Sequence, residues 1–121
     1  MQSEKELITN IVNNYFKGTY LGDAQLLKNA FHPEARITGI FKGDYCDWSL
    51  DEFIARVTTK PAAIENEDPY NKEIISLEVT NNASIVKAAV TVNGIMFTDY
   101  ITLLKINNCW VIRNKSFTTK S

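Results

Sequence analysis

Residues 73–119 read EIISLEVTNNASIVKAAVTVNGIMFTDYITLLKINNCWVIRNKSFTT. Runs rich in β-branched and aromatic residues predict strands over Glu73–Thr80, Ser84–Val92, Ile95–Ile106 and Cys109–Thr119. The breaks between these runs are Asn81-Asn82, Asn93-Gly94 and Asn107-Asn108. Asparagine and glycine tolerate the positive φ angles of tight hairpin turns, and short connections force neighbouring strands to be antiparallel. We therefore predict an antiparallel meander in the second half of the chain.

The sequence before the meander is mostly helical. Ser3 with Glu6, and Ser49 with Glu52, have the spacing of capping boxes, and apolar residues recur every three or four positions after each pair. Between and after these helices the pattern predicts a helix over residues 24–30, a strand over 35–41 and an exposed loop over 58–71. Helices followed by a meander predict an α+β fold, in which a strongly curved sheet carries three N-terminal helices on its concave face.

Composition excludes several classes of function. The 121 residues are expected to form a single domain, 1–121, and 13 Lys and Arg against 14 Asp and Glu leave a net charge of −1. This balance lacks the basic footprint of a nucleic-acid-binding protein. The apolar runs are too short to span a bilayer. The first residues, MQSEKE, are acidic where a secretory signal would be basic and then apolar, so we expect a cytoplasmic protein that binds neither nucleic acid nor membrane.

Cysteine and histidine usage argues against a metal site. Cys46 and Cys109 are far apart in sequence and neither belongs to a Cys-x-x-Cys pair, and His32 is the only histidine. We expect no metal, and two free thiols in a reducing compartment. The glycine-rich patterns that cradle nucleotide phosphates do not occur, so no cofactor is expected.

Several short segments resemble one superfamily. The order of helices around FHPEA (31–35), the strand after it and WSLDEF (48–53) is similar to the NTF2-like superfamily, which includes ketosteroid isomerases, SnoaL-type cyclases and scytalone dehydratase. YLGD (20–23), FTDYITLLK (97–105) and WVIRNKSF (110–117) resemble its putative lumazine-binding branch. The resemblance covers essentially the whole chain. It implies a cystatin-like cone with a ligand cavity on the concave side of its sheet.

The resemblance singles out Tyr15 and Asp99. Aligned on Gly22-Asp23, Tyr15 falls where ketosteroid isomerases hold a tyrosine that donates to the substrate oxygen. Asp99 falls where they hold a second donor, a carboxylic acid kept neutral by apolar surroundings. Asp99→Asn should then keep the fold, because an amide is nearly isosteric with the neutral acid. The alternatives are that Tyr15 is a core aromatic residue and that Asp99 bonds another buried side chain.

One position departs from the isomerases. Their proton-moving carboxylate lies on the first strand, and the aligned residue here is Gly39, which has no side chain. Two hydrogen-bonding groups without a base imply a binding site and argue against an isomerase.

Other candidates are weighed against structural roles. His32 could act as a general base, or it could interact with the end of the preceding helix. Trp48, Phe53 and Trp110 could wall a flat ligand, or they could fill the core. Lys115 could meet an anionic ligand group, but strand alternation from Arg113 predicts that it faces solvent.

Three functions follow from these residues. The first is binding of a small, largely apolar or flat aromatic molecule by Tyr15, Trp48, Phe53, Asp99 and Trp110. The second is a SnoaL- or dehydratase-type enzyme with Asp99 and His32 as acid and base and Tyr15 as electrophilic donor. The third is a dimeric protein-interaction module with a filled cavity.

The outer face of the sheet predicts self-association. Strand alternation points Thr98, Tyr100, Thr102, Leu104 and Ile106 away from Asp99, and this row is apolar for a solvated surface. We expect a homodimer joined through this face, a mode that the resemblance also implies. The alternative is that the acidic loop or the chain ends cover the row.

Overall fold

The computed structural model describes residues 2–59, 61–62 and 64–120. Within these residues, three helices and a six-stranded sheet follow one another along the chain. Their order is α1 (Glu4–Leu21), α2 (Ala24–Ala30), β1 (Phe31–Phe41), β2 (Asp44–Ser49), α3 (Leu50–Thr58), β3 (Asn71–Thr80), β4 (Ala83–Val92), β5 (Ile95–Ile106) and β6 (Cys109–Thr119). The α+β fold predicted from the sequence is confirmed. No helix in the described part of the chain is long and apolar enough to cross a membrane.

The helices begin where their capping residues predict. The side chain of Ser3 accepts a hydrogen bond from the backbone of Glu6, and Ser49 and Glu52 form a complete reciprocal capping box at α3. Gly22 ends α1 in the left-handed conformation, with φ of 67°. Residues 64–67 form turns in the predicted loop, of which positions 60 and 63 lie outside the described residues.

The sheet order is β2-β1-β6-β5-β4-β3. Strands β3 to β6 form the predicted antiparallel meander, and Asn81, Asn93, Asn107 and Asn108 at its turns have positive φ angles. One pairing differs from a wholly antiparallel sheet, because β1 lies parallel to β6. No short connection joins these two strands, so turn geometry does not fix their relative direction.

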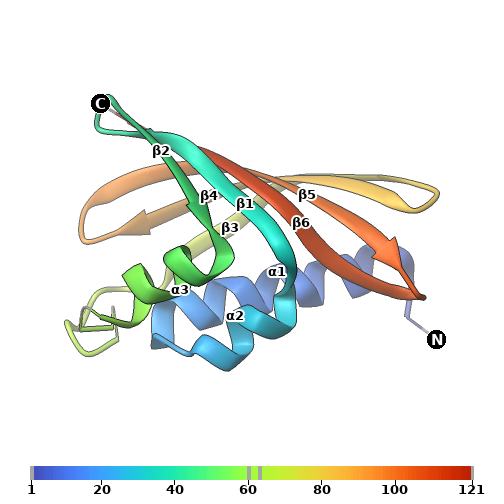
Figure 1. The fold of residues 1–121 in the computed structure, drawn as a ribbon, viewed down its shortest axis with the longest axis horizontal. Coiled ribbons are helices and arrows are strands. Elements are labelled where there is room, and N and C mark those ends of the chain that lie inside the picture. The colour runs from blue at the N-terminus through green and yellow to red at the C-terminus, as the bar shows by residue number, and fades with distance from the viewer. Residues whose placement is uncertain (1, 60, 63, 121) are drawn as a thin grey trace.

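The helices cover one face of the curved sheet. In Figure 1 the sheet arches over α1, α2 and α3, which all lie on its concave side. The core forms between these layers. Its most completely buried apolar side chains include Ile8, Val12, Phe16, Leu27, Ile37, Val86, Ile101, Leu103 and Ile112.

A β-bulge in β6 changes which of its side chains face the helices. Thr102 pairs with Asn114 but the next residue, Leu103, pairs with Ile112, so Arg113 is an extra residue. Trp110 and Ile112 are buried before the bulge, and Lys115 and Phe117 are buried after it. The prediction that Lys115 faces solvent is therefore wrong, because simple alternation does not continue through a bulge.

Candidate functional site

A polar cluster lies inside the otherwise apolar core, between α1 and the strands β5 and β6. The Tyr15 hydroxyl donates to Oδ2 of Asp99 at 2.7 Å, and Nζ of Lys115 donates to the Tyr15 oxygen at 2.7 Å. Nζ of Lys115 is also 3.8 Å from Oδ2 of Asp99, and both side chains are almost fully buried. Oδ2 of Asp99 thus accepts a hydrogen bond from another buried side chain, which is the alternative considered for Asp99 from the sequence.

Burial shifts the pKa values of both neighbours of Asp99, Tyr15 and Lys115. Burial, followed by the charge of Asp99 and its hydrogen bond, raises the pKa of Tyr15 well above the usual tyrosine value, so Tyr15 remains a donor. Burial also lowers the pKa of the Lys115 ammonium, while Asp99 opposes that change. These two effects act on the Lys115 pKa in opposite directions, because burial makes an ammonium costly and Asp99 supplies it with a partner.

Aromatic rings surround the Lys115 ammonium. Nζ lies 4.7 Å from the ring centroids of Tyr15 and Phe53 and 5.4 Å from that of Phe117. At these distances the faces of the rings attract a cation. The three rings and Asp99 together surround the Lys115 ammonium at the inner end of the cavity described next.

A cavity of about 420 Å³ opens beside this cluster, within the size range of small-molecule sites. Its apolar lining consists mainly of Tyr15, Phe41, Trp48, Phe53, Val57, Val90, Val92, Ile95, Phe97 and Phe117. These side chains come from helices α1 and α3, from the hairpin β1–β2 and from the meander. The bend of the sheet therefore brings distant parts of the sequence to one site.

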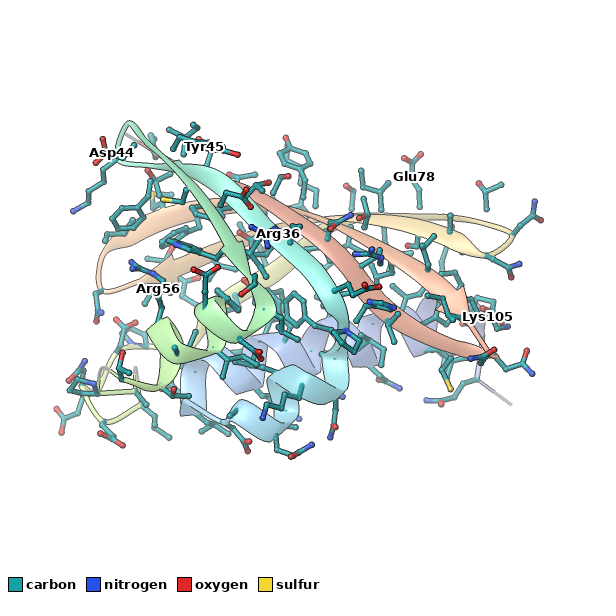
Figure 2. All side chains as sticks on the ribbon, in the orientation of Figure 1. Arg36, Asp44, Tyr45, Arg56, Glu78 and Lys105 are labelled. Carbon is teal, nitrogen blue, oxygen red and sulfur yellow. The ribbon has the colours of Figure 1, made fainter. Side chains whose placement is uncertain are left out.

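The charged lining is mostly basic. Arg56, Lys72 and Lys115 line the cavity, and Asp99 is the single acidic side chain among its described lining residues. The Arg56 guanidinium lies 4.4 Å from the Trp48 ring centroid, and Arg56 projects from α3 near β2 in Figure 2. Burial lowers the pKa of Lys72, and Asp99 and Asp68 oppose the change. The exposed Arg56 and the buried Lys115 mark the outer and inner ends of the cavity.

One oxygen at the inner end has no partner among the described residues. Oδ1 of Asp99 is buried and accepts no hydrogen bond from them, although Oδ2 is bonded to Tyr15. A buried acceptor without a donor is costly. Because Asp99 lines the cavity, a ligand with an N–H or O–H group could supply the missing donor.

Gly39 shows why no base lies on the first strand. A Cβ atom at this position would clash with the Phe117 carbonyl oxygen and with the Phe117 ring. The Phe117 ring instead packs across the glycine and stacks on Trp48, with 5.9 Å between ring centroids. The space that a catalytic side chain would need is occupied by a wall of the cavity.

The structure brings four of the predicted site residues together and separates two. Tyr15, Trp48, Phe53 and Asp99 all line the cavity. His32 is outside its described lining, and Nδ1 of His32 accepts from the backbone N–H of Glu34, two residues away. This is a local structural bond rather than the acid–base pairing with Asp99 considered from the sequence.

Trp110 also lies away from the cavity. Its indole Nε1 donates to Glu4, which is paired with Lys105 at 2.9 Å. Figure 2 shows Lys105 and Arg56 at opposite ends of the molecule. The expectation that Trp110 walls the ligand site is therefore corrected, because Trp110 precedes the bulge and packs near the start of α1.

The sequence-based interpretation missed Lys115 as a buried residue of the site. A signal for it was present, because Ile112 and Phe117 are both large and apolar but stand five positions apart. Regular alternation cannot place both on one face, so a break between them was required. Lys72 and Arg56 gave no such signal, since their role depends on the tertiary arrangement of β3 and α3.

Cys46 and Cys109 are both free, and Cys109 is exposed. Among the residues that the structure describes, no group of three or more His, Cys, Asp or Glu side chains could hold a metal ion.

Comparison with known proteins agrees with this fold. The sequence pattern of the family described as putative lumazine-binding matches residues 3–118. No curated protein matches the chain. Three solved structures of NTF2-like proteins of unknown function are similar. The protein from Silicibacter pomeroyi is 25% identical with a TM-score of 0.87, and the match covers 99% of this chain and 100% of that one. The protein from Shewanella baltica is 19% identical with a TM-score of 0.85, and the match covers 98% of this chain and 94% of that one. The protein from Methylobacillus flagellatus is 20% identical with a TM-score of 0.84, and the match covers 99% of this chain and 96% of that one.

Proposed function

The chain belongs to the putative lumazine-binding family of NTF2-like proteins, and from this premise we propose that it binds a small, flat aromatic molecule in the cavity beside Asp99. The observation that carries the proposal is the unpartnered Oδ1 of Asp99, which lies at the inner end of a cavity with aromatic walls. A ligand that combines a flat apolar ring with a hydrogen-bond donor at one edge satisfies both features.

The aromatic walls support a flat shape. Trp48 and Phe117 are nearly parallel, with an interplanar angle of 18°, and Phe97 packs against Phe117 at 5.8 Å between centroids. Further rings come from Phe41 and Phe53. Rings attract one another best in offset-stacked or edge-to-face arrangements, so a planar ligand gains most from such a lining.

The polar groups support a specific orientation. The free oxygen of Asp99 takes a donor from the ligand, while Lys115 and Lys72 interact with carbonyl oxygens or a negative charge. Lumazine, the compound in the description of the family, is a fused bicyclic ring with N–H groups beside carbonyl oxygens. Its edge is complementary to a carboxylate flanked by ammonium groups.

Calorimetric titration of the protein with lumazine tests this proposal. Trp48→Ala removes one aromatic wall and should weaken binding by about tenfold, which corresponds to about 1.4 kcal/mol. Tyr45→Ala is the matched control, because Tyr45 is an aromatic residue of the same strand that is 71% exposed and outside the cavity lining. It should leave the affinity unchanged. Equal losses in both variants, or no binding of lumazine by the unchanged protein, would contradict the proposal.

A SnoaL- or dehydratase-type enzyme that uses Asp99 and His32 as acid and base is less well supported. His32 is engaged with its own backbone neighbourhood and is not among the described residues that line the cavity with Asp99. A general base must come within hydrogen-bond reach of the substrate. Ligand binding needs no such pair, so we retain binding as the function.

A further inference from the structure

We propose that Lys115 captures carbonyl compounds reversibly, by forming an imine with an aromatic aldehyde or ketone that enters the cavity. The proposal rests on the proposed function, because the carbonyl compound must occupy the same cavity. It goes beyond that function because it assigns covalent chemistry to a residue that a binding site would need only for its charge.

The position of Lys115 suits a nucleophilic amine. The side chain is 6% exposed, yet it lines the cavity, so its nitrogen can meet a ligand without full contact with water. Burial lowers its pKa, which increases the fraction of neutral amine near neutral pH. Lysines of this kind, placed in apolar pockets, are the ones that form Schiff bases with carbonyl substrates.

The neighbours of Lys115 can move the protons that the reaction requires. The Tyr15 hydroxyl lies between Nζ of Lys115 and Oδ2 of Asp99, at 2.7 Å from each. A proton can therefore pass from the ammonium to the carboxylate through the hydroxyl. Oδ1 of Asp99 has no described hydrogen-bond partner and is free to accept from the hydroxyl of the addition product.

The steps balance as follows. The protonated lysine gives one proton to Asp99 through Tyr15, and the nitrogen lone pair then forms a bond to the carbonyl carbon. The π electrons of the carbonyl move to its oxygen, which takes a proton from the nitrogen to give a carbinolamine. Asp99 returns its proton through the Tyr15 hydroxyl to the hydroxyl of the carbinolamine, the C–O bond breaks and water leaves. The product is a protonated imine, and the site has the same charge as before.

The surroundings of Lys115 also stabilise this product. The protonated imine is a cation at the position of the original ammonium, among the rings of Tyr15, Phe53 and Phe117 and beside Asp99. Every contact that favours the lysine cation therefore favours the imine cation. The half-buried Lys87, whose Nζ lies 5.7 Å from the Tyr100 ring centroid, is outside the described lining of the cavity and lacks this combination.

Trapping with borohydride tests the proposal. The protein is incubated with naphthaldehyde, a flat aromatic aldehyde, and then reduced with sodium borohydride, which converts an imine into a stable secondary amine. Peptide mapping by mass spectrometry should find the adduct at Lys115 at least about tenfold in excess of any other lysine. The excess should be largest near neutral pH, where exposed lysines are almost wholly protonated.

Variants separate this chemistry from simple binding. Lys115→Arg keeps a cation but cannot form an imine, and should lose the adduct, whereas Lys87→Arg, at a residue outside the described cavity lining, should retain it. Tyr15→Phe removes the proton relay and should slow trapping by about tenfold or more. If Trp48 fluorescence shows that naphthaldehyde binds to the unchanged protein but Lys115 reacts no more than exposed lysines, this inference is overturned and the proposed function stands. If neither naphthaldehyde nor lumazine binds, both fail.

Discussion

Asp99 and Lys115 stabilise each other in a place where neither charge is stable alone. Their closest atoms are 3.8 Å apart, and Tyr15 bridges them with two short hydrogen bonds. Removing one member of such a buried pair leaves an uncompensated charge, whereas removing both leaves an apolar core. The cluster should therefore behave as a unit in measurements of stability.

A double-mutant cycle tests this coupling. Asp99→Asn and Lys115→Met should each lower the free energy of unfolding by about 3 kcal/mol. The double variant should lose less than the sum of the two, by at least about 1 kcal/mol, because it contains no unpaired charge. Urea denaturation of the four proteins supplies the values. Strict additivity would show that the two side chains do not interact. The expected loss in Asp99→Asn differs from the near-neutral effect that a protonated Asp99 would have given.

At the scale of elements, α3 depends on its capping box and carries part of the cavity wall. Ser49 and Glu52 satisfy each other's backbone N–H groups, and the next turn presents Phe53 and Arg56 to the site. Ser49→Ala should cost about 1 kcal/mol of stability, a typical value for the loss of an N-cap. We expect ligand affinity to fall with it, since the wall residues would be less well ordered.

The capping box also predicts a pH dependence. The hydrogen bond from the Ser49 backbone, followed by that of its side chain, lowers the pKa of Glu52 below its ordinary value. The folded protein therefore binds fewer protons than the unfolded chain just below that ordinary value, and the contribution of Glu52 is lost as the pH falls through its folded pKa. The difference in stability between the unchanged protein and Glu52→Gln should narrow on acidification. Denaturation curves near pH 7 and near pH 3 measure it, and a constant difference would disprove the effect.

The elements also show how far the sequence predicts this molecule. Caps and asparagine turns are local signals, so α1, α3 and the meander were predictable from residues such as Ser3, Ser49 and Asn93. The parallel pairing of β1 with β6 was not, because no local connection encodes it. Asp99 and Tyr15 were identified through the resemblance, whereas the position of Lys115 depends on one extra residue in β6. Whether Lys115 is buried depends on the register of β6 against β5, and that register is set by both strands together.

At the scale of the whole molecule, the outer face of the sheet is exposed and apolar. Tyr100, Leu104 and Ile106 are 44%, 37% and 37% exposed, and Ile85 on the neighbouring strand is 42% exposed. These values show that the described loop residues and chain ends do not cover the row. Figure 2 shows Tyr45 and Glu78 on the same side of the sheet, opposite the helices.

We propose that this outer face joins two copies of the chain. Leu104→Lys places a charge in the middle of the row and should shift a dimer towards monomer, with a loss of affinity of at least about tenfold. Leu21→Lys is the control, because Leu21 is 45% exposed at the end of α1, away from this face. Light scattering over a concentration series measures the molecular mass. A monomer at high concentration in the unchanged protein would refute the proposal.

The parallel pairing of β1 with β6 makes the order of synthesis matter. Arg36 and Asn114, which are hydrogen-bonded across this pairing, are 78 residues apart, so β1 is made long before its neighbour leaves the ribosome. The wall formed by Lys115 and Phe117 is likewise missing from a nascent chain in which β6 is incomplete. Contacts this distant in sequence form slowly, and until they form β5 presents an open edge. A ligand can therefore protect the protein only after β6 has been added, and an interrupted chain remains open to aggregation and proteolysis.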